Sequence, residues 1–300
     1  MRTKLSLLFL LVFTNSWAQE ILVLGIAQDA GKPQLGCSKE CCASWDPREN
    51  GSPVSLALLD SASQQWFLFE ASPQIRRQLQ KLPPEYPALP AGVFITHAHM
   101  GHYGGLIQLG REAANTQSIP LYAGQRFCDF IKTNGPWDQL VNLKNIVPNP
   151  MPDKGFGLEG TSIWIEALEV PHRDEYSETL GYIIKANNSS LLFVPDIDKW
   201  ERWELDIDSL IHEVDYALVD ATFFDGNELP NRNMNEIPHP FVIESMQGWN
   251  HLNAADKAKV YFIHLNHTNP LWNSESAQSK KVEESGFKIA RPGMRFPLNF

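Results

Sequence analysis

The segment FITHAHMGHYGGL (residues 94–106) places three histidines directly behind an apolar strand. His97 and His99 are two residues apart, so in extended backbone their side chains point the same way and can bind one metal ion together. His102 follows a turn that contains Gly101, which leaves it free to face a neighbouring position. The segment therefore predicts a metal site at the end of a strand.

The same arrangement recurs along the chain, because a side chain able to bind metal follows several other apolar strands. These residues are His172, Asp196, Asp220 and His264, with Asn266 and His267 just beyond. Since strands of one sheet share an edge, we expect these side chains to meet in one pocket. A zinc ion held by three neutral imidazoles lowers the pKa of its bound water to about 7. Asp196 is the predicted catalytic carboxylate, which bridges two metals or orients that water.

Short apolar, β-branched or aromatic runs predict the strands, and amphipathic stretches between them predict the helices. The expected strands span 21–27, 55–60, 65–72, 91–96, 119–124, 162–170, 179–186, 189–196, 216–222 and 259–267, and the expected helices span 72–82, 104–116, 240–249 and 274–285. Hairpins and helical crossovers both occur, which favours an α/β sandwich with mixed sheets. We find no repeat or linker, so residues 19–300 are expected to form one domain.

The first 18 residues have the pattern of a secretory signal peptide. A basic start is followed by the apolar stretch Leu5–Phe13, which is too short to span a bilayer, and then by polar residues and Ala18. We expect cleavage after Ala18 and a secreted or periplasmic protein without a membrane anchor. The net charge of −10 argues against nucleic acid as a partner. A small-molecule substrate is expected, and the oligomeric state is left open.

Three of the four cysteines, Cys37, Cys41 and Cys42, are crowded into the segment GCSKECC (residues 36–42). In an exported chain they are candidates for a disulfide. The same spacing suits a structural zinc with one more ligand from elsewhere in the chain. Both alternatives stay open from the sequence, with free thiols as a third.

Taken together, the motifs resemble a known family. The segment THAHMGH (residues 96–102) resembles the His-x-His-x-Asp-His motif of the metallo-β-lactamase superfamily. More narrowly, the chain resembles the pyrroloquinoline quinone biosynthesis protein B branch. The segments that carry this resemblance are LGIAQDAGKPQLGC (24–37), PDID (195–198), DATFFDGNEL (220–229) and IHLNHTNP (263–270).

The resemblance implies a four-layer αββα sandwich with mixed sheets and with metals at one sheet edge. It implies one metal on three histidines, a bridging aspartate, and a second metal on two further histidines: His97, His99 and His172; Asp196; His102 and His264. Gly101 stands where the superfamily has an aspartate for the second metal. The first zinc is therefore expected to be firmly bound and the second site altered or partial, with iron or manganese as alternatives. Asp29 or His267 is a candidate replacement ligand, and Asp220 a candidate ligand or partner of a ligand.

These expectations leave three functions to compare. The first is an exported zinc hydrolase acting on an ester, lactone, amide or phosphoester. The second is a metal-dependent oxygenase or hydroxylase of the pyrroloquinoline quinone branch, and the third is a metal-binding protein without turnover. The remaining histidines, His212, His239 and His251, are expected to be structural or at the surface.

Overall fold

A computed structural model describes residues 19–298, apart from residues 47, 50, 174, 230–232 and 234–235. The proposed signal peptide, residues 1–18, lies outside the described part, whose first strand begins at Gln19. Within the described residues, no helix is both long and apolar enough to cross a membrane.

The first sheet contains seven strands in the described part of the chain, in the order β14-β1-β2-β3-β4-β5-β6. The strands are β1 (Gln19–Gly25), β2 (Ser55–Asp60), β3 (Gln65–Phe69), β4 (Gly92–Phe94), β5 (Ile119–Ala123), β6 (Ile146–Pro150) and β14 (Arg295–Pro297). Pairing is antiparallel from β14 to β3 and parallel from β3 to β6.

The second sheet, also of seven described strands, has the order β13-β12-β11-β10-β9-β8-β7. Its strands are β7 (Phe156–Gly157), β8 (Ile163–Glu169), β9 (Leu180–Ala186), β10 (Ser189–Val194), β11 (Tyr216–Asp220), β12 (Val260–Ile263) and β13 (Lys288–Ile289). Pairing is parallel from β13 to β10 and antiparallel from β10 to β7. Both sheets are therefore mixed, as expected.

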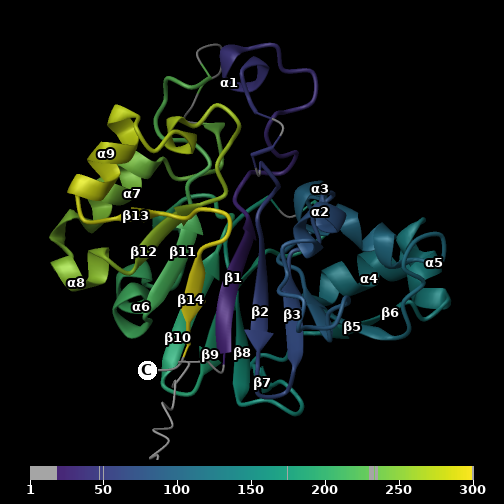
Figure 1. Ribbon diagram of the computed structural model, residues 1–300. Helices are drawn as coiled ribbons and strands as arrows, with labels where there is room; N and C mark the ends of the chain where they lie inside the picture. Colours follow the sequence, from purple (N-terminus) through teal and green to yellow (C-terminus); the bar gives the residue numbers. More distant parts are fainter. Residues whose placement is uncertain are drawn as a thin grey trace, which may run out of the picture.

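Helices cover the outer face of each sheet, so the molecule has four layers (Figure 1). Beside the first sheet lie α2 (Ile75–Leu79), α3 (Met100–Tyr103), α4 (Gln125–Thr133) and α5 (Trp137–Asn142). Beside the second lie α6 (Ile207–Glu213), α7 (Val242–Gly248), α8 (Ala254–Lys257) and α9 (Ala277–Glu284), while α1 (Glu40–Ala43) lies in a long loop. Short 3-10 helices span Gly104–Leu109, Trp200–Arg202, Trp249–His251 and Pro270–Trp272. The helix expected at 104–116 is thus a shorter 3-10 helix.

The first sheet is buried on both faces, and its sequence shows why. In β1, Ile21 and Val23 belong to the core between the sheets, whereas Leu22 and Leu24 pack under the helices. Successive strand residues point to opposite faces, so a strand in a middle layer needs an unbroken apolar run. The two sheets meet through aromatic rings, such as Phe69 and Tyr182, whose centroids are 5.5 Å apart.

The topology brings the carboxyl ends of many strands to one edge of the sandwich. In the first sheet, β1, β3 and β4 run in the same direction, because β1 and β3 are both antiparallel to β2. In the second sheet, β8, β10, β11 and β12 share a direction by the same reasoning. The candidate residues follow these strands, so the strand directions assemble the site.

Candidate metal centre

Three histidines and one aspartate bring their donor atoms together at this edge. His97 Nε2 lies 2.8 Å from His99 Nδ1, and His172 Nε2 lies 3.4 Å from the same atom. The Asp196 carboxylate lies 3.4 Å from His97 Nε2 and 3.3 Å from His172 Nε2. All four donors lie within 4.8 Å of one another and could hold a metal ion. Nitrogen and oxygen donors of this kind suit zinc and also iron.

Two further histidines, His102 and His264, also approach Asp196. His102 Nε2 is 3.7 Å and His264 Nε2 is 3.9 Å from Asp196 Oδ2. Both histidines are fully buried. Among the described residues, neither Nε2 atom has a hydrogen-bond partner. Buried polar atoms are rarely left unpaired, so these nitrogens fit a group that supplies the missing partner, such as a metal ion.

The other ring nitrogen of each histidine faces a polar side chain. His97 and His264 are hydrogen-bonded there to threonines, and the other three histidines face carboxylates. The pairs and distances are His97–Thr96 2.8 Å, His172–Asp198 3.2 Å, His102–Glu70 3.3 Å, His264–Thr222 3.0 Å and His99–Glu175 3.5 Å. Such partners fix the ring orientation and the tautomer of a metal ligand. They direct Nε2 of four rings and Nδ1 of His99 toward the centre.

Burial and the neighbouring charges shift the pKa values of the residues in the site. Burial lowers the pKa of His97 well below its usual value. Burial also disfavours the charged form of His172, but the carboxylates of Asp196 and Asp198 raise its pKa to about 10. Burial likewise opposes the charge on Asp196, yet His172, His239 and His264 hold its pKa well below the usual range. Metal binding would displace such protons, because metal ligands must be deprotonated.

Asp220 and His239 form a hydrogen-bonded pair beside the centre. His239 Nδ1 lies 2.8 Å from Asp220 Oδ2 and 3.2 Å from Asp196 Oδ1. The Asp220 carboxylate also accepts hydrogen bonds from the backbone of Ile197 and from the backbone and hydroxyl of Thr222. Asp220, Asp196, His239 and His264 could themselves hold a metal ion. However, the hydrogen bonds already made by Asp220 favour a role as the partner that orients His239.

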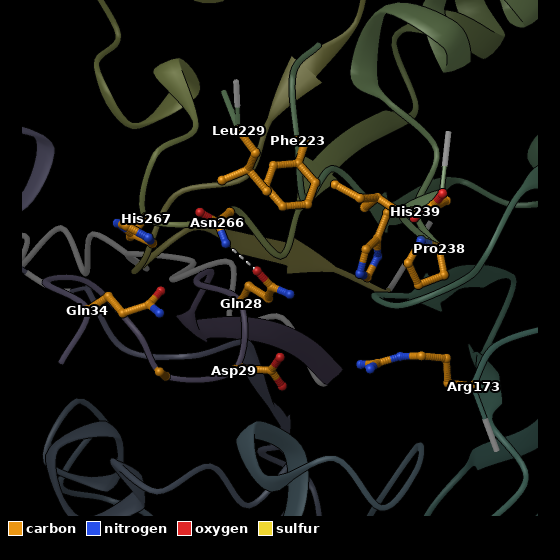
Figure 2. A pocket seen from close by; sticks show the side chains of 13 residues that line it. Gln28, Asp29, Gln34, Arg173, Phe223, Leu229, Pro238, His239, Asn266 and His267 are labelled. Carbon is orange, nitrogen blue, oxygen red and sulfur yellow. Dashed lines mark hydrogen bonds between the residues drawn. The ribbon is translucent and has the colours of Figure 1, made fainter. Parts of the chain in front are cut away.

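A cavity of about 670 Å³ opens beside the centre. Figure 2 shows His239 and Asp29 on its wall, with Arg173 extending across it toward Asp29. Asn266 also lines it, but its amide donates to Gln28 Oε1 at 2.6 Å. The cavity gives a small molecule access to His239 and Asp29.

The cysteine cluster forms a separate group with His267. Cys42 Sγ lies 3.3 Å and Cys41 Sγ 3.7 Å from His267 Nδ1, and the two sulfurs are 3.9 Å apart. Cys37 completes a set of four donors within 4.8 Å. All four cysteines of the chain are described and none is in a disulfide. His267 is thus the fourth donor of this cysteine group, rather than a member of the histidine centre.

The structure places the remaining histidines in two ways. His212 and His251 lie at the surface, as expected, with side chains 75% and 63% exposed. His239 is buried beside Asp196, so its assignment to structure or surface missed its place in the centre. It lies late in the connection from β11 to α7, far beyond the strand end, and the strand-end pattern therefore gave no signal for it.

Comparisons with known proteins agree with this arrangement. The sequence profile described as "Beta-lactamase superfamily domain" matches residues 65–265. "Coenzyme PQQ synthesis protein B" of Methylococcus capsulatus is 26% identical over 93% of this chain and 99% of the relative. The protein of the same name from Rhizobium meliloti is 28% identical over 93% of this chain and 97% of the relative.

Solved structures show the same fold. Zn(2+)-bound PqqB from Methylobacterium extorquens has a TM-score of 0.76 at 21% identity, covering 92% of this chain and 99% of the other. A diphosphatase from the PhnP family has a TM-score of 0.67 at 18% identity, covering 93% and 96%. These likenesses confirm the four-layer α/β sandwich with mixed sheets.

Proposed function

The chain belongs to the beta-lactamase superfamily, and from this premise we propose that it is a metal-dependent hydrolase that uses zinc. The observation that carries the proposal is the convergence of His97 Nε2, His99 Nδ1, His172 Nε2 and the Asp196 carboxylate beside a cavity. When bound there, a zinc ion would supply a water of lowered pKa at neutral pH. Asp196 Oδ2 lies 3.4 Å from His97 Nε2 and 3.7 Å from His102 Nε2, so this carboxylate could serve both donor groups.

His239 is the proposed proton donor to the leaving group. It lies at the cavity wall, and Asp220 fixes its Nδ1 from behind. Burial disfavours the charged form, but Asp220 and Asp196 raise the pKa of His239 above its usual value. A protonated imidazole held in this way can act as a general acid.

Arg173 favours a substrate with an anionic group. Its guanidinium extends into the cavity from the side opposite the Asn266 loop (Figure 2). Guanidinium groups pair well with phosphate and carboxylate oxygens. Among esters, lactones, amides and phosphoesters, we therefore favour a phosphoester.

A screen with a matched control tests this function. Purified protein is assayed with a phosphodiester, a carboxylic ester, a lactone and a β-lactam, and the active substrate is then tested with His97→Ala and His212→Ala. His97→Ala should abolish turnover and remove metal, whereas the exposed His212 should be dispensable. Full turnover in His97→Ala, or no turnover with any substrate class, contradicts the proposal.

A second candidate function rests on the relatives. Proteins named for coenzyme PQQ synthesis match this chain over 93% of its length. An oxygenase or hydroxylase of that type would use iron. Metal analysis after expression in medium containing both metals, with oxygen consumption as the readout, separates it from the zinc hydrolase.

Two further features complete the proposal. The Cys37, Cys41, Cys42 and His267 group suits a structural zinc, because three sulfurs and one nitrogen form a common tetrahedral set. Loss of one metal equivalent in Cys41→Ser, without loss of the metal held by His97, would support it.

We also propose export with cleavage after Ala18, which sequencing of the N-terminus of the mature protein tests directly.

A further inference from the structure

Gly101 removes a carboxylate from the histidine motif, and a different part of the chain comes to the same place. We propose that Asp29, from the loop after β1, supplies the missing carboxylate ligand of the second metal position. This inference rests on the proposed metal-dependent function and assigns the ligand set of the second position.

The space beside Gly101 is occupied by Asp29. A Cβ atom built on Gly101 would lie 2.3 Å from Asp29 Cα and 2.8 Å from both Asp29 O and Asp29 Oδ1. Real Cβ atoms essentially never approach other atoms so closely. The absence of a side chain at 101 is therefore what allows the Asp29 loop to enter, and its carboxylate lies where a side chain from 101 would begin.

The backbone holds Asp29 in this position from both sheets. Ala27 pairs with Leu265 across the gap between β1 and β12, through Gln28 N–H to Leu265 O at 2.9 Å. A turn closed by Gly31 N–H to Gln28 O at 2.9 Å then directs Asp29 toward His102. Asp29 has a φ of +26°, a backbone conformation that few non-glycine residues adopt. Strained conformations of this kind often mark functional sites.

Both carboxylates approach His102. Asp29 Oδ1 lies 3.9 Å from His102 Nε2, which in turn lies 3.7 Å from Asp196 Oδ2. Within the described residues, Asp29 Oδ1, His102 Nε2 and His264 Nε2 are all buried and have no hydrogen-bond partner. Under this proposal, two imidazoles and two carboxylates contribute donors to the position. Two carboxylates match the charge of a divalent ion and favour a harder ion than the three-imidazole position does.

The other candidate ligands for this position, His267 and Asp220, already have partners. His267 directs Nδ1 at Cys41 and Cys42. Asp220 accepts hydrogen bonds on both oxygens, from Thr222 on one and from His239 and Ile197 on the other. Asp29 Oδ1 is the candidate carboxylate oxygen that remains unpaired.

The amount of metal that each variant binds tests the role of Asp29 without an activity assay. The variants are Asp29→Ala and the isosteric Asp29→Asn, with Glu236→Ala as control because Glu236 lines the same cavity but belongs to neither metal group. Each protein is loaded with zinc, equilibrated at fixed free metal and analysed by mass spectrometry. Asp29→Ala should bind about one equivalent less than the unaltered chain, and Asp29→Asn should bind the second ion at least about 10-fold more weakly. Glu236→Ala should match the unaltered chain.

A second pair of variants tests the spatial argument. Gly101→Ala adds no donor atom, but it should displace the Asp29 loop and lose the same equivalent. Gly248→Ala is the control, because a Cβ there meets nothing within 4 Å. Circular dichroism and the metal held by His97 show whether each variant is folded.

The outcomes separate this inference from the proposed function. An unchanged metal content in Asp29→Ala, or an unaltered chain with no ion beside His102 in an anomalous difference map, overturns the role of Asp29 while leaving a one-metal hydrolase intact. Absence of metal at His97 as well would overturn the proposed function itself.

Discussion

The Asp196 carboxylate lies 3.4 Å from His97 Nε2, and both side chains are at most 2% exposed. A buried carboxylate needs compensating charge, which here comes from the histidines and, when present, from a cation. The stability of the protein should therefore depend on bound metal.

Removal of metal by a chelator should lower the melting temperature. A ligand present at 1,000 times its Kd stabilises the folded state by about 4 kcal/mol. Calorimetry before and after chelation measures this, and restored zinc should reverse it. Because metal bound by the cysteine cluster would contribute to the same shift, Cys41→Ser serves as the background. If chelation left that variant's melting temperature unchanged, the buried histidine centre would not be a metal site.

The outer partner of His172 should tune metal affinity. Asp198 Oδ1 lies 3.2 Å from His172 Nδ1, and loss of such a partner typically weakens metal binding about 10–100-fold. We expect this for Asp198→Ala in competition titrations with a chromophoric chelator. Arg202→Ala is the control, since Arg202 contacts only the other oxygen, Oδ2, at 3.1 Å. Equal affinities for the two variants would contradict the role of Asp198.

Loss of His239 should slow substrates with poor leaving groups most. A general acid contributes about 100- to 10,000-fold to the rate, but a nitrophenolate leaves without a proton. We expect His239→Gln to reduce kcat strongly for an alkyl phosphodiester and weakly for a nitrophenyl one. Metal content should stay constant. A uniform loss across leaving groups would assign His239 to metal binding instead.

Arg173 should govern the binding of anionic substrates. Arg173→Gln is expected to raise KM for a phosphodiester about 10-fold, which corresponds to about 1.4 kcal/mol. A neutral ester should be unaffected, and Arg173→Lys should retain part of the binding. Steady-state kinetics with the two substrates checks this. Parallel changes for both would show that Arg173 does not recognise charge.

Glu228 should make stability fall as the pH rises. Burial raises the pKa of Glu228 to about 7, against the hydrogen bonds from Phe224 N–H and Thr268 that favour its charged form. The protonated form is thus favoured in the folded state, and this stability is complete below about pH 4.5 and lost by about pH 7. Over this window the free energy of unfolding should fall about 2 kcal/mol less in Glu228→Gln than in the unaltered chain. One pKa unit is worth about 1.4 kcal/mol, and Glu228 is only partly buried. Denaturant unfolding at pH 5 and pH 8 measures the free energy of unfolding of both proteins. An equal change between the two pH values in both proteins would refute the prediction.

Local patterns determined much of the architecture and of the first donor group. Each strand expected from an apolar run has a counterpart in the two sheets, because burial on both faces requires such runs. The strand-end rule also identified His97, His99, His172 and Asp196, which the structure brings together. Shared strand direction explains this success, since it places the residues after parallel strands at one edge.

Contacts between distant loops were decided by the tertiary structure alone. His239 lies far beyond the end of β11, yet its loop brings it within 3.2 Å of Asp196. Asp29 reaches Gly101 through the pairing of Ala27 with Leu265, two residues that are adjacent only after the sheets pack. His267 likewise joins the cysteines from the far end of the chain. Periodicity reports which face of a strand is buried, whereas the approach of one loop to another depends on the packed sheets that support both.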